Sequence, residues 1–355
     1  MKLRVLVVDD SKLMRRLISD ILNADPALEV VAEAPDGPAA IRLIHELRPD
    51  AVTLDVEMPG MSGLEVLGYI MSEIPTPVVI LSGMRTPDLA MQALALGAVD
   101  FMRKPSGTIS VDLYKVKEEL VNKVKAAPLA NLRQLRQGVE QAPLGNGAPS
   151  PPTMAISSKD TPANWCVVIG ASTGGPQALT PLLADLPAGL AAGFLLVQHM
   201  PAGFTRSLAQ RLNKHCRLSV VEAEEGMPFQ AGWVYVAPGG HHLVVQGGQD
   251  QAKASVHLDD SPPRGTLRPA VDVTMAAAAA CFGTHTLGVI LTGMGSDGAE
   301  GCREIRQVGG RTIAQDRHTS LIYGMPRVVA EQGLADQVLP LDGIAQAIAK
   351  IALEE

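Results

Sequence analysis

The sequence predicts two α/β domains, each built on a parallel or mostly parallel β-sheet. The first 125 residues alternate between short apolar runs and segments whose apolar residues recur three and four positions apart, as at Leu13, Leu17 and Ile21. A similar alternation resumes near residue 164, after a stretch rich in Ala, Pro and Gly. The 355 residues suffice for two domains of ordinary size. We therefore expect an N-terminal domain over 1–125, a linker over 126–163 and a C-terminal domain over 164–355.

The N-terminal domain is predicted to contain five βα units. Strand-like apolar runs occur at 3–8, 29–34, 51–54, 78–81 and 99–102, with helical periodicity between them. Such units join parallel strands through right-handed helical crossovers, so they predict a doubly wound, five-stranded parallel sheet with helices on both faces. Ligands of these sheets bind at the carboxyl ends of the strands.

Charged residues gather at these strand ends. Asp9 and Asp10 follow the first strand, Asp55 the third, and Lys104 the fifth. Carboxylates crowded into one crevice repel one another unless a hard cation joins them, and Mg²⁺ suits oxygen ligands while leaving room for phosphate. Lys104 would neutralise phosphoryl oxygens, and Asp55 would act as a nucleophile that forms an acyl phosphate. The competing interpretation, that strand-end aspartates cap the following helices, suits a single Asp better than the whole set.

Three segments of this domain resemble the receiver domain of two-component response regulators: 7–11 (VVDDS), 54–63 (LDVEMPGMSG) and 104–105 (KP). The resemblance covers residues 1 to about 125 and implies a flavodoxin-like fold. It also implies that a sensor histidine kinase phosphorylates Asp55. It assigns the Mg²⁺ site to Asp9, Asp10 and Asp55. It assigns the switch positions to Ser82, Phe101 and Lys104, with Ser82 standing where the family more often has Thr.

In the C-terminal domain, strand-like runs occur at 166–169, 194–197, 287–291 and 311–314, and a β-rich, Gly-containing stretch covers 233–245. Ser172, within 170–176 (GASTGGP), follows the first run and precedes a predicted helix. A serine among small residues at such a turn is exposed beside helix N–H groups, as a nucleophile with an oxyanion hole requires. A plain turn or an anion-binding loop are the alternatives, although no Lys follows as in a P-loop.

His199 is the candidate general base because it follows the strand-like run at 194–198 and so reaches the same sheet edge as Ser172. The pair His241-His242 is the strongest competitor among the eight histidines. Asp297, after the third run, would orient the imidazole and stabilise the imidazolium. The chain order of these three residues differs from that of α/β-hydrolases, so we expect a different fold with convergent chemistry.

The segment that carries Asp297 permits a second interpretation. Residues 293–298 (GMGSDG) satisfy the GxGxxG pattern, follow a strand and open a helix, and Asp316 lies after the next strand, as in dinucleotide-binding proteins. A receiver joined to a nucleotide-dependent oxidoreductase therefore stays open at this point, as does a non-enzymatic regulator whose second domain only binds its partners. The pairing with Ser172 and His199 favours the hydrolase.

Together, segments 170–176, 198–201 (QHMP), 291–298 (LTGMGSDG) and 314–316 (AQD) resemble the CheB family of chemotaxis protein-glutamate methylesterases. The resemblance implies a catalytic triad of Ser172, His199 and Asp297. It places Thr173 and Met294 in the oxyanion environment. It implies hydrolysis of glutamate γ-methyl esters on chemotaxis receptors, deamidation of some receptor glutamines, phosphorylation by the chemotaxis histidine kinase, and no cofactor for the esterase step.

Composition restricts partners and location. The chain has 30 Lys+Arg against 37 Asp+Glu, a net charge of −7, which argues against non-specific nucleic-acid binding. No uninterrupted apolar run approaches the roughly 18 residues of a membrane span, and the first residues do not resemble a signal peptide. The four cysteines lack metal-site spacing and indicate buried thiols in a reducing compartment. We therefore expect a cytoplasmic protein with no nucleic-acid partner and no direct membrane insertion.

Overall fold

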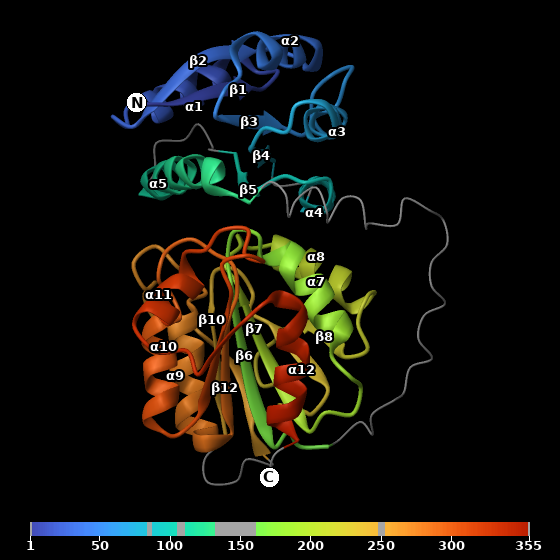
Figure 1. The fold of residues 1–355 in the computed structure, drawn as a ribbon, viewed down its shortest axis with the longest axis vertical. Helices are drawn as coiled ribbons and strands as arrows, with labels where there is room; N and C mark the ends of the chain where they lie inside the picture. Colours follow the sequence, from blue (N-terminus) through green and yellow to red (C-terminus); the bar gives the residue numbers. More distant parts are fainter. Residues whose placement is uncertain (1, 84–86, 105–110, 132–160, 248–252, 354–355) are drawn as a thin grey trace. The chain divides into compact units, whose positions relative to one another are not determined.

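The computed structural model describes residues 2–83, 87–104, 111–131, 161–247 and 253–353. The chain divides into two compact units, Met1–Leu144 and Gly145–Glu355, each with its own parallel sheet (Figure 1). The predicted linker, 126–163, falls largely outside the described residues.

The N-terminal unit contains the predicted five-stranded parallel sheet. Its spatial order is β2-β1-β3-β4-β5, the flavodoxin-like arrangement, which confirms the predicted fold class. The strands are β1 (Leu3–Val8), β2 (Leu28–Ala34), β3 (Ala51–Asp55), β4 (Val78–Ser82) and β5 (Asp100–Arg103). Two helix layers cover the sheet, one of α1 (Lys12–Asn23) and α5 (Val111–Ala126), the other of α2 (Gly37–Leu47), α3 (Gly63–Glu73) and α4 (Pro87–Ala95) (Figure 1).

Local capping signals start the first three helices of this unit. Ser11 caps α1 and Asp36 caps α2, each accepting a backbone N–H from the first helical turn. Ser62 forms a capping box with Glu65 at the start of α3. The caps of α1 and α3 are therefore serines, and the strand-end aspartates Asp10 and Asp55 are not used to start these helices.

The C-terminal unit has a seven-stranded sheet in the order β14-β13-β12-β6-β7-β9-β8, and every described pairing within it is parallel. Its strands are β6 (Trp165–Ala171), β7 (Ala192–Gln198), β8 (Ser219–Glu222), β9 (Trp233–Val236), β12 (Thr286–Ile290), β13 (Arg311–Gln315) and β14 (Gln337–Leu339). A separate antiparallel pair consists of β10 (His242–Gln246) and β11 (Ser255–Asp259). The β-rich stretch at 233–245 is thus divided between two sheets.

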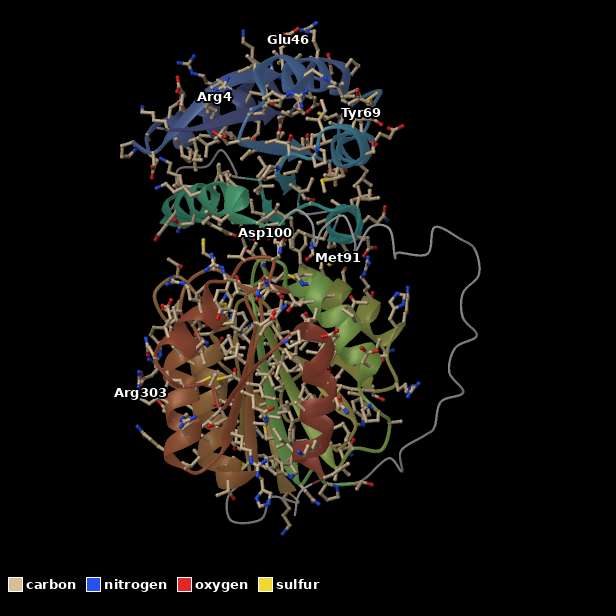
Figure 2. All side chains as sticks on the ribbon, viewed as in Figure 1. Arg4, Glu46, Tyr69, Met91, Asp100 and Arg303 are labelled. Carbon is tan, nitrogen blue, oxygen red and sulfur yellow. The ribbon has the colours of Figure 1, made fainter. Side chains whose placement is uncertain are left out.

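Helices cover both faces of this larger sheet (Figure 1). One layer holds α7 (Gly175–Asp185), α8 (Phe204–Asn213) and α12 (Leu341–Ala352), and the other holds α9 (Val271–Phe282), α10 (Ala299–Gln307) and α11 (Met325–Glu331). On the outer side of α10, Arg303 projects away from the sheet and donates to Gln332 (2.9 Å) (Figure 2). In the described part of the chain, no helix has the length and apolar character that crossing a bilayer requires.

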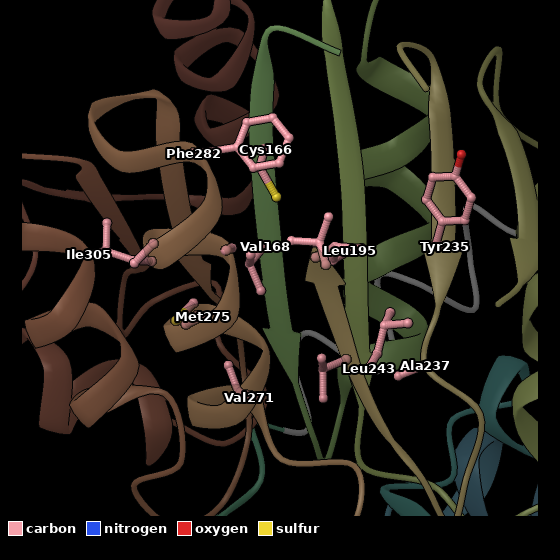
Figure 3. Close-up of a cluster of buried hydrophobic side chains, with 14 of the residues drawn as sticks. Cys166, Val168, Leu195, Tyr235, Ala237, Leu243, Val271, Met275, Phe282 and Ile305 are labelled. Atoms are coloured by element: carbon pink, nitrogen blue, oxygen red, sulfur yellow. The ribbon is translucent and has the colours of Figure 1, made fainter. Parts of the chain in front are cut away.

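Helix α9 is anchored to the central strands by a buried apolar cluster (Figure 3). Val168 of β6 and Leu195 of β7 belong to the same cluster as Met275 and Phe282 of α9. All residues of β6 and β7 are buried, which explains why these strands appear in the sequence as continuous apolar runs. The cluster fixes α9 against the sheet, so the first turn of this helix has a defined position at the carboxyl ends of the strands.

Leu195→Ala should lower the free energy of unfolding of the C-terminal unit by about 2–5 kcal/mol, because truncating a fully buried leucine leaves a cavity. Urea denaturation of the full chain measures this change. The matched control is Leu353→Ala, which removes a side chain that is 74% exposed and should cost less than about 0.5 kcal/mol. Equal losses in the two variants would contradict this description of the core.

Candidate active site

Three neighbouring strands of the C-terminal unit bring their carboxyl ends together at one edge of the sheet. Strand β6 lies between β7 and β12, and the chain leaves it toward β7 and later returns to β12 on its other side. Ser172 directly follows β6, and its N–H donates to the Thr292 carbonyl (3.0 Å), just beyond β12. His199 directly follows β7, and its N–H donates to the Ala171 carbonyl (3.0 Å). These bonds extend the sheet pairing past the strands and bring the three loops together at the point where strand order reverses.

His199 and Asp297 are directly hydrogen-bonded, with 2.7 Å between Nε2 and Oδ2. The same oxygen accepts the Val271 N–H (2.7 Å), and Oδ1 accepts the Asp272 N–H (3.0 Å). Burial by itself would raise the pKa of Asp297, but His199 and these N–H groups together bring it below its usual value. Asp297 is thus an ionised acceptor, so Nε2 of His199 carries the shared proton and Nδ1 is the nitrogen that can accept another.

Ser172 is half-buried beside the glycine loop 293–298. A Cβ at Gly293 would lie only 2.8 Å from the Ser172 Cβ, so glycine permits this close approach. Among the described residues, no hydrogen bond joins Ser172 Oγ to His199. Bonds between nucleophile and base commonly form only once substrate is bound. The structure therefore shows His199 and Asp297 already paired, with Ser172 on the adjoining strand end.

Gln198 is a contributor that the sequence did not single out. Its side chain is 3% exposed, and Nε2 donates to the carbonyls of Ser172 (2.9 Å) and His199 (3.2 Å). This amide joins the loop that contains Ser172 to the loop that contains His199. The available signal was a polar residue that ends an otherwise apolar, buried strand.

A backbone donor beside the Ser172 loop suits an oxyanion. The start of α7 offers less, because the Gly175 N–H already donates to the Ser172 carbonyl (2.8 Å) and Pro176 has no N–H. The backbone N–H of Met294 has no hydrogen-bond acceptor in the described part of the chain, and this residue is half-buried. Thr173 is buried, and its carbonyl accepts the hydroxyl of Thr292 (2.9 Å), which holds the two loops together.

The geometry disfavours a dinucleotide at residues 293–298. A pyrophosphate would need the N–H groups at the start of α10, but Asp272 Oδ1 already accepts those of Gly298 and Gly301 (both 2.8 Å). Asp316, the residue expected to bind a ribose, instead accepts the Thr319 N–H (2.9 Å) within its own turn. Two carboxylates at this helix start would also repel the phosphates.

The competing histidines have other partners. His242 is fully buried, and its Nδ1 accepts the Ala270 N–H (3.1 Å) while Nε2 lies 3.4 Å from the Pro262 carbonyl. Burial lowers the pKa of His242, which keeps the ring neutral and able to accept that N–H. His241 Nδ1 lies 2.6 Å from Asp260 Oδ1. Both rings therefore hold the loops before α9 in place.

The N-terminal unit brings its predicted acidic residues together. Carboxylate oxygens of Asp9, Asp10 and Asp55 lie within 4.8 Å of one another, a donor set that fits a hard divalent cation such as Mg²⁺. Lys104 Nζ lies 2.9 Å from Asp9 Oδ2 and 2.6 Å from Asp55 Oδ2. Burial raises the pKa of Asp55 even though Lys104 opposes this shift. Burial alone would lower the pKa of Lys104, but its bonds to the two carboxylates raise it.

The predicted switch residues occupy different positions in this sheet. Ser82 is fully buried at the end of β4, the strand that pairs with β3 and so lies next to Asp55. Phe101 pairs with Ile80 within the sheet and is 3% exposed, and its carbonyl accepts a hydrogen bond from Lys123 Nζ (2.8 Å). Pro105 of the predicted motif lies outside the described residues.

Comparison with known proteins agrees with both halves of this description. Residues 167–348 match the family model for the CheB methylesterase, and residues 5–112 match that for the response regulator receiver domain. The chain is 47% identical to a protein-glutamate methylesterase/protein-glutamine glutaminase of Symbiobacterium thermophilum, with 98% of this chain and 96% of the relative covered. It is 46% identical to a protein of the same description from Geobacillus kaustophilus, with 98% of both covered.

A solved structure supports the same assignment for the C-terminal unit. The Thermotoga maritima CheB methylesterase catalytic domain is 43% identical, with a TM-score of 0.51, over 53% of this chain and 98% of that chain. The chain therefore belongs to the CheB methylesterase family, with a response regulator receiver domain preceding its methylesterase domain.

Proposed function

We propose that this chain is a protein-glutamate methylesterase that acts on γ-methyl esters of glutamate in chemotaxis receptors, with Ser172, His199 and Asp297 as its catalytic triad. The observation that carries the proposal is the 2.7 Å bond between His199 and Asp297 at the sheet edge where Ser172 emerges. The descriptions of the relatives supply the substrate class.

The reaction proceeds through an acyl-enzyme. Ser172 Oγ attacks the ester carbonyl carbon while its proton passes to Nδ1 of His199, because Nε2–H remains bound to Asp297. The Met294 N–H would donate to the oxyanion, beside the Thr173 segment. Collapse of the tetrahedral intermediate expels methoxide, which takes the proton from His199 and leaves as methanol. Water then attacks the acyl-serine by the same route and releases the glutamate carboxylate. A receptor glutamine would follow the same path with ammonia as the leaving group.

The receiver domain would control this activity through Asp55. A chemotaxis histidine kinase transfers a phosphoryl group to Asp55. Asp9, Asp10 and Asp55 would hold Mg²⁺, which would supply positive charge against the phosphoryl oxygens. Lys104 exchanges its present carboxylate partners for those oxygens, and Ser82 and Phe101 report the change. The unphosphorylated receiver restrains the esterase, and phosphorylation shifts the population toward an active arrangement. This control would serve sensory adaptation in the cytoplasm.

Ser172→Ala should reduce methanol release from a methylated receptor fragment by at least about 10³-fold, because loss of the nucleophile removes the acyl-enzyme route. Ser219→Ala, at the opposite end of the sheet, is the matched control and should retain normal activity. If Ser172→Ala still binds the receptor but releases no methanol, the protein is an enzyme and not a regulator that only binds receptors. Wild-type release by Ser172→Ala would show that this serine is not the nucleophile.

Asp55→Asn should abolish the rise in methanol release that a small-molecule phosphodonor with Mg²⁺ produces in the wild type, because the amide cannot form an acyl phosphate. Asp20→Asn, which changes an exposed receiver carboxylate, should still be stimulated. Activity of unphosphorylated Asp55→Asn equal to that of the phosphorylated wild type would refute restraint by the receiver.

Chelation of divalent cations should remove the same stimulation while leaving basal methanol release unchanged, since the cation serves only the carboxylate cluster of the receiver. Phosphorylation of Asp55 and methanol release are measured in parallel, and added Mg²⁺ should restore both. A loss of basal activity on chelation would instead place a metal in the esterase step.

A further inference from the structure

Asp297 of the proposed triad and Asp272 each cap a helix that begins in the other residue's segment. The N-cap residues of α9 and α10 are Ala270 and Gly298, and neither supplies a side-chain cap. Instead, Asp297, which precedes α10, accepts N–H groups from the first turn of α9, namely those of Val271 and Asp272. In return, Asp272 accepts N–H groups at the start of α10. Each helix start thus depends on a carboxylate from the other segment.

This exchange determines how Asp297 faces His199. Both oxygens of Asp297 are occupied, and two of its three hydrogen-bond donors belong to α9. The two helices also approach closely at Gly301, where a Cβ would lie 2.5 Å from the Met275 Cβ, and the Gly301 N–H is itself bound to Asp272. Because α9 is anchored in the core, Asp272 ties the segment carrying Asp297 to a rigid support.

The exchange also places two partly buried carboxyl groups next to each other. Burial, together with the charge of Asp297, raises the pKa of Asp272 to about 6, although N–H groups from α10 oppose the shift. Asp297, in contrast, has a lowered pKa and stays ionised. Asp272 is therefore neutral well below pH 6 and negative well above it. The charged state adds a second negative charge near the imidazolium that forms on His199 during catalysis.

Other ionisable groups face this pair from the surrounding elements. Cys302 of α10 stays a neutral thiol, because burial raises its pKa to about 12, with the Asp272 charge contributing. His242 of β10 binds the Ala270 N–H just before α9 and has a pKa lowered by burial. His199 lies on the far side of Asp297. The wild type and an Asp272 variant both contain all of these groups, so the two proteins differ only at residue 272.

We propose that Asp272 is a positioning residue of the esterase: its carboxylate holds Asp297 against His199, and its ionisation adds a second negative charge that stabilises the imidazolium. The inference rests on the proposed triad. Asp272 touches neither substrate nor reacting atoms in this role and acts only through Asp297.

The test compares Asp272→Asn and Asp272→Ala with the wild type, using full-length protein saturated with phosphodonor and Mg²⁺. Methanol release gives kcat and KM from about pH 5 to about pH 8. The asparagine oxygen keeps the bonds to Gly298 and Gly301 and its amide can donate to Asp297, as protonated Asp272 does, but it never becomes charged. The ratio of wild-type to Asp272→Asn kcat should therefore be near one at low pH and rise about tenfold through pH 6.

Asp272→Ala should lower kcat by about 10–100-fold with little change in KM, because it releases the start of α10 without altering the substrate surface. Asp336→Asn is the matched control: Asp336 also accepts a backbone N–H, that of Thr312 (2.8 Å), but at the opposite end of the sheet. The ratio of wild-type kcat to Asp336→Asn kcat should not vary with pH. Thermal unfolding of each variant separates lost stability from lost positioning.

A constant ratio for Asp272→Asn across this pH range, or an unchanged kcat in Asp272→Ala, would overturn the proposal, since a purely structural cap predicts no pH-dependent ratio. Ser172→Ala, assayed alongside, distinguishes a failure of the proposed role of Asp272 from a failure of the proposed triad. If Ser172→Ala is inactive while the Asp272 variants behave as the wild type, only the role of Asp272 fails. If Ser172→Ala is active, the proposed triad itself fails.

Discussion

The parallel pairing of β6 with both β7 and β12 is the constraint on which the active site depends. Because strand order reverses at β6, the loops that follow these three strands come together at the carboxyl edge of the sheet. Backbone bonds from Ser172 and His199 continue the pairing for one more residue, so both side chains begin from rigid strand ends. Residues far apart in the chain thereby acquire the fixed separations that proton transfer requires.

Both candidate sites bury carboxylates, and they compensate for lost hydration in different ways. In the receiver, Asp9 and Asp55 pair with the ammonium group of Lys104, a side-chain partner that phosphoryl oxygens could replace. In the esterase, Asp297 is held by His199 and by backbone N–H groups that cannot leave without unwinding a helix. The first arrangement suits a switch and the second suits a fixed, ionised partner for an imidazole, since reorganisation is desirable in one and costly in the other.

Most of the strands that the sequence predicted are largely buried, although β2, which is partly exposed, was predicted as well. Runs such as those forming β6 and β7 are continuous and apolar, so they could be identified without knowledge of their neighbours. The sequence did not predict β8, β11 and β14, which are short and partly exposed, because their stability comes from pairing with other strands. The GxGxxG pattern at 293–298 was ambiguous because its outcome also depends on distant residues. Only the structure shows that the Asp272 carboxylate already accepts the N–H groups that a phosphate would need.

The sequence by itself determined the two α/β units, the strand ends on which Asp55, Ser172, His199 and Asp297 lie, and the resemblance to the family that the comparisons then established. These features follow from local patterns: apolar periodicity, helix signals and short motifs. Only the tertiary structure decided that Asp297 reaches His199, that Gln198 bridges two loops, and that Asp272 and Asp297 exchange caps. The physical reason is that these contacts join segments distant in the chain, and their geometry is set by sheet order and helix packing, which no local pattern encodes.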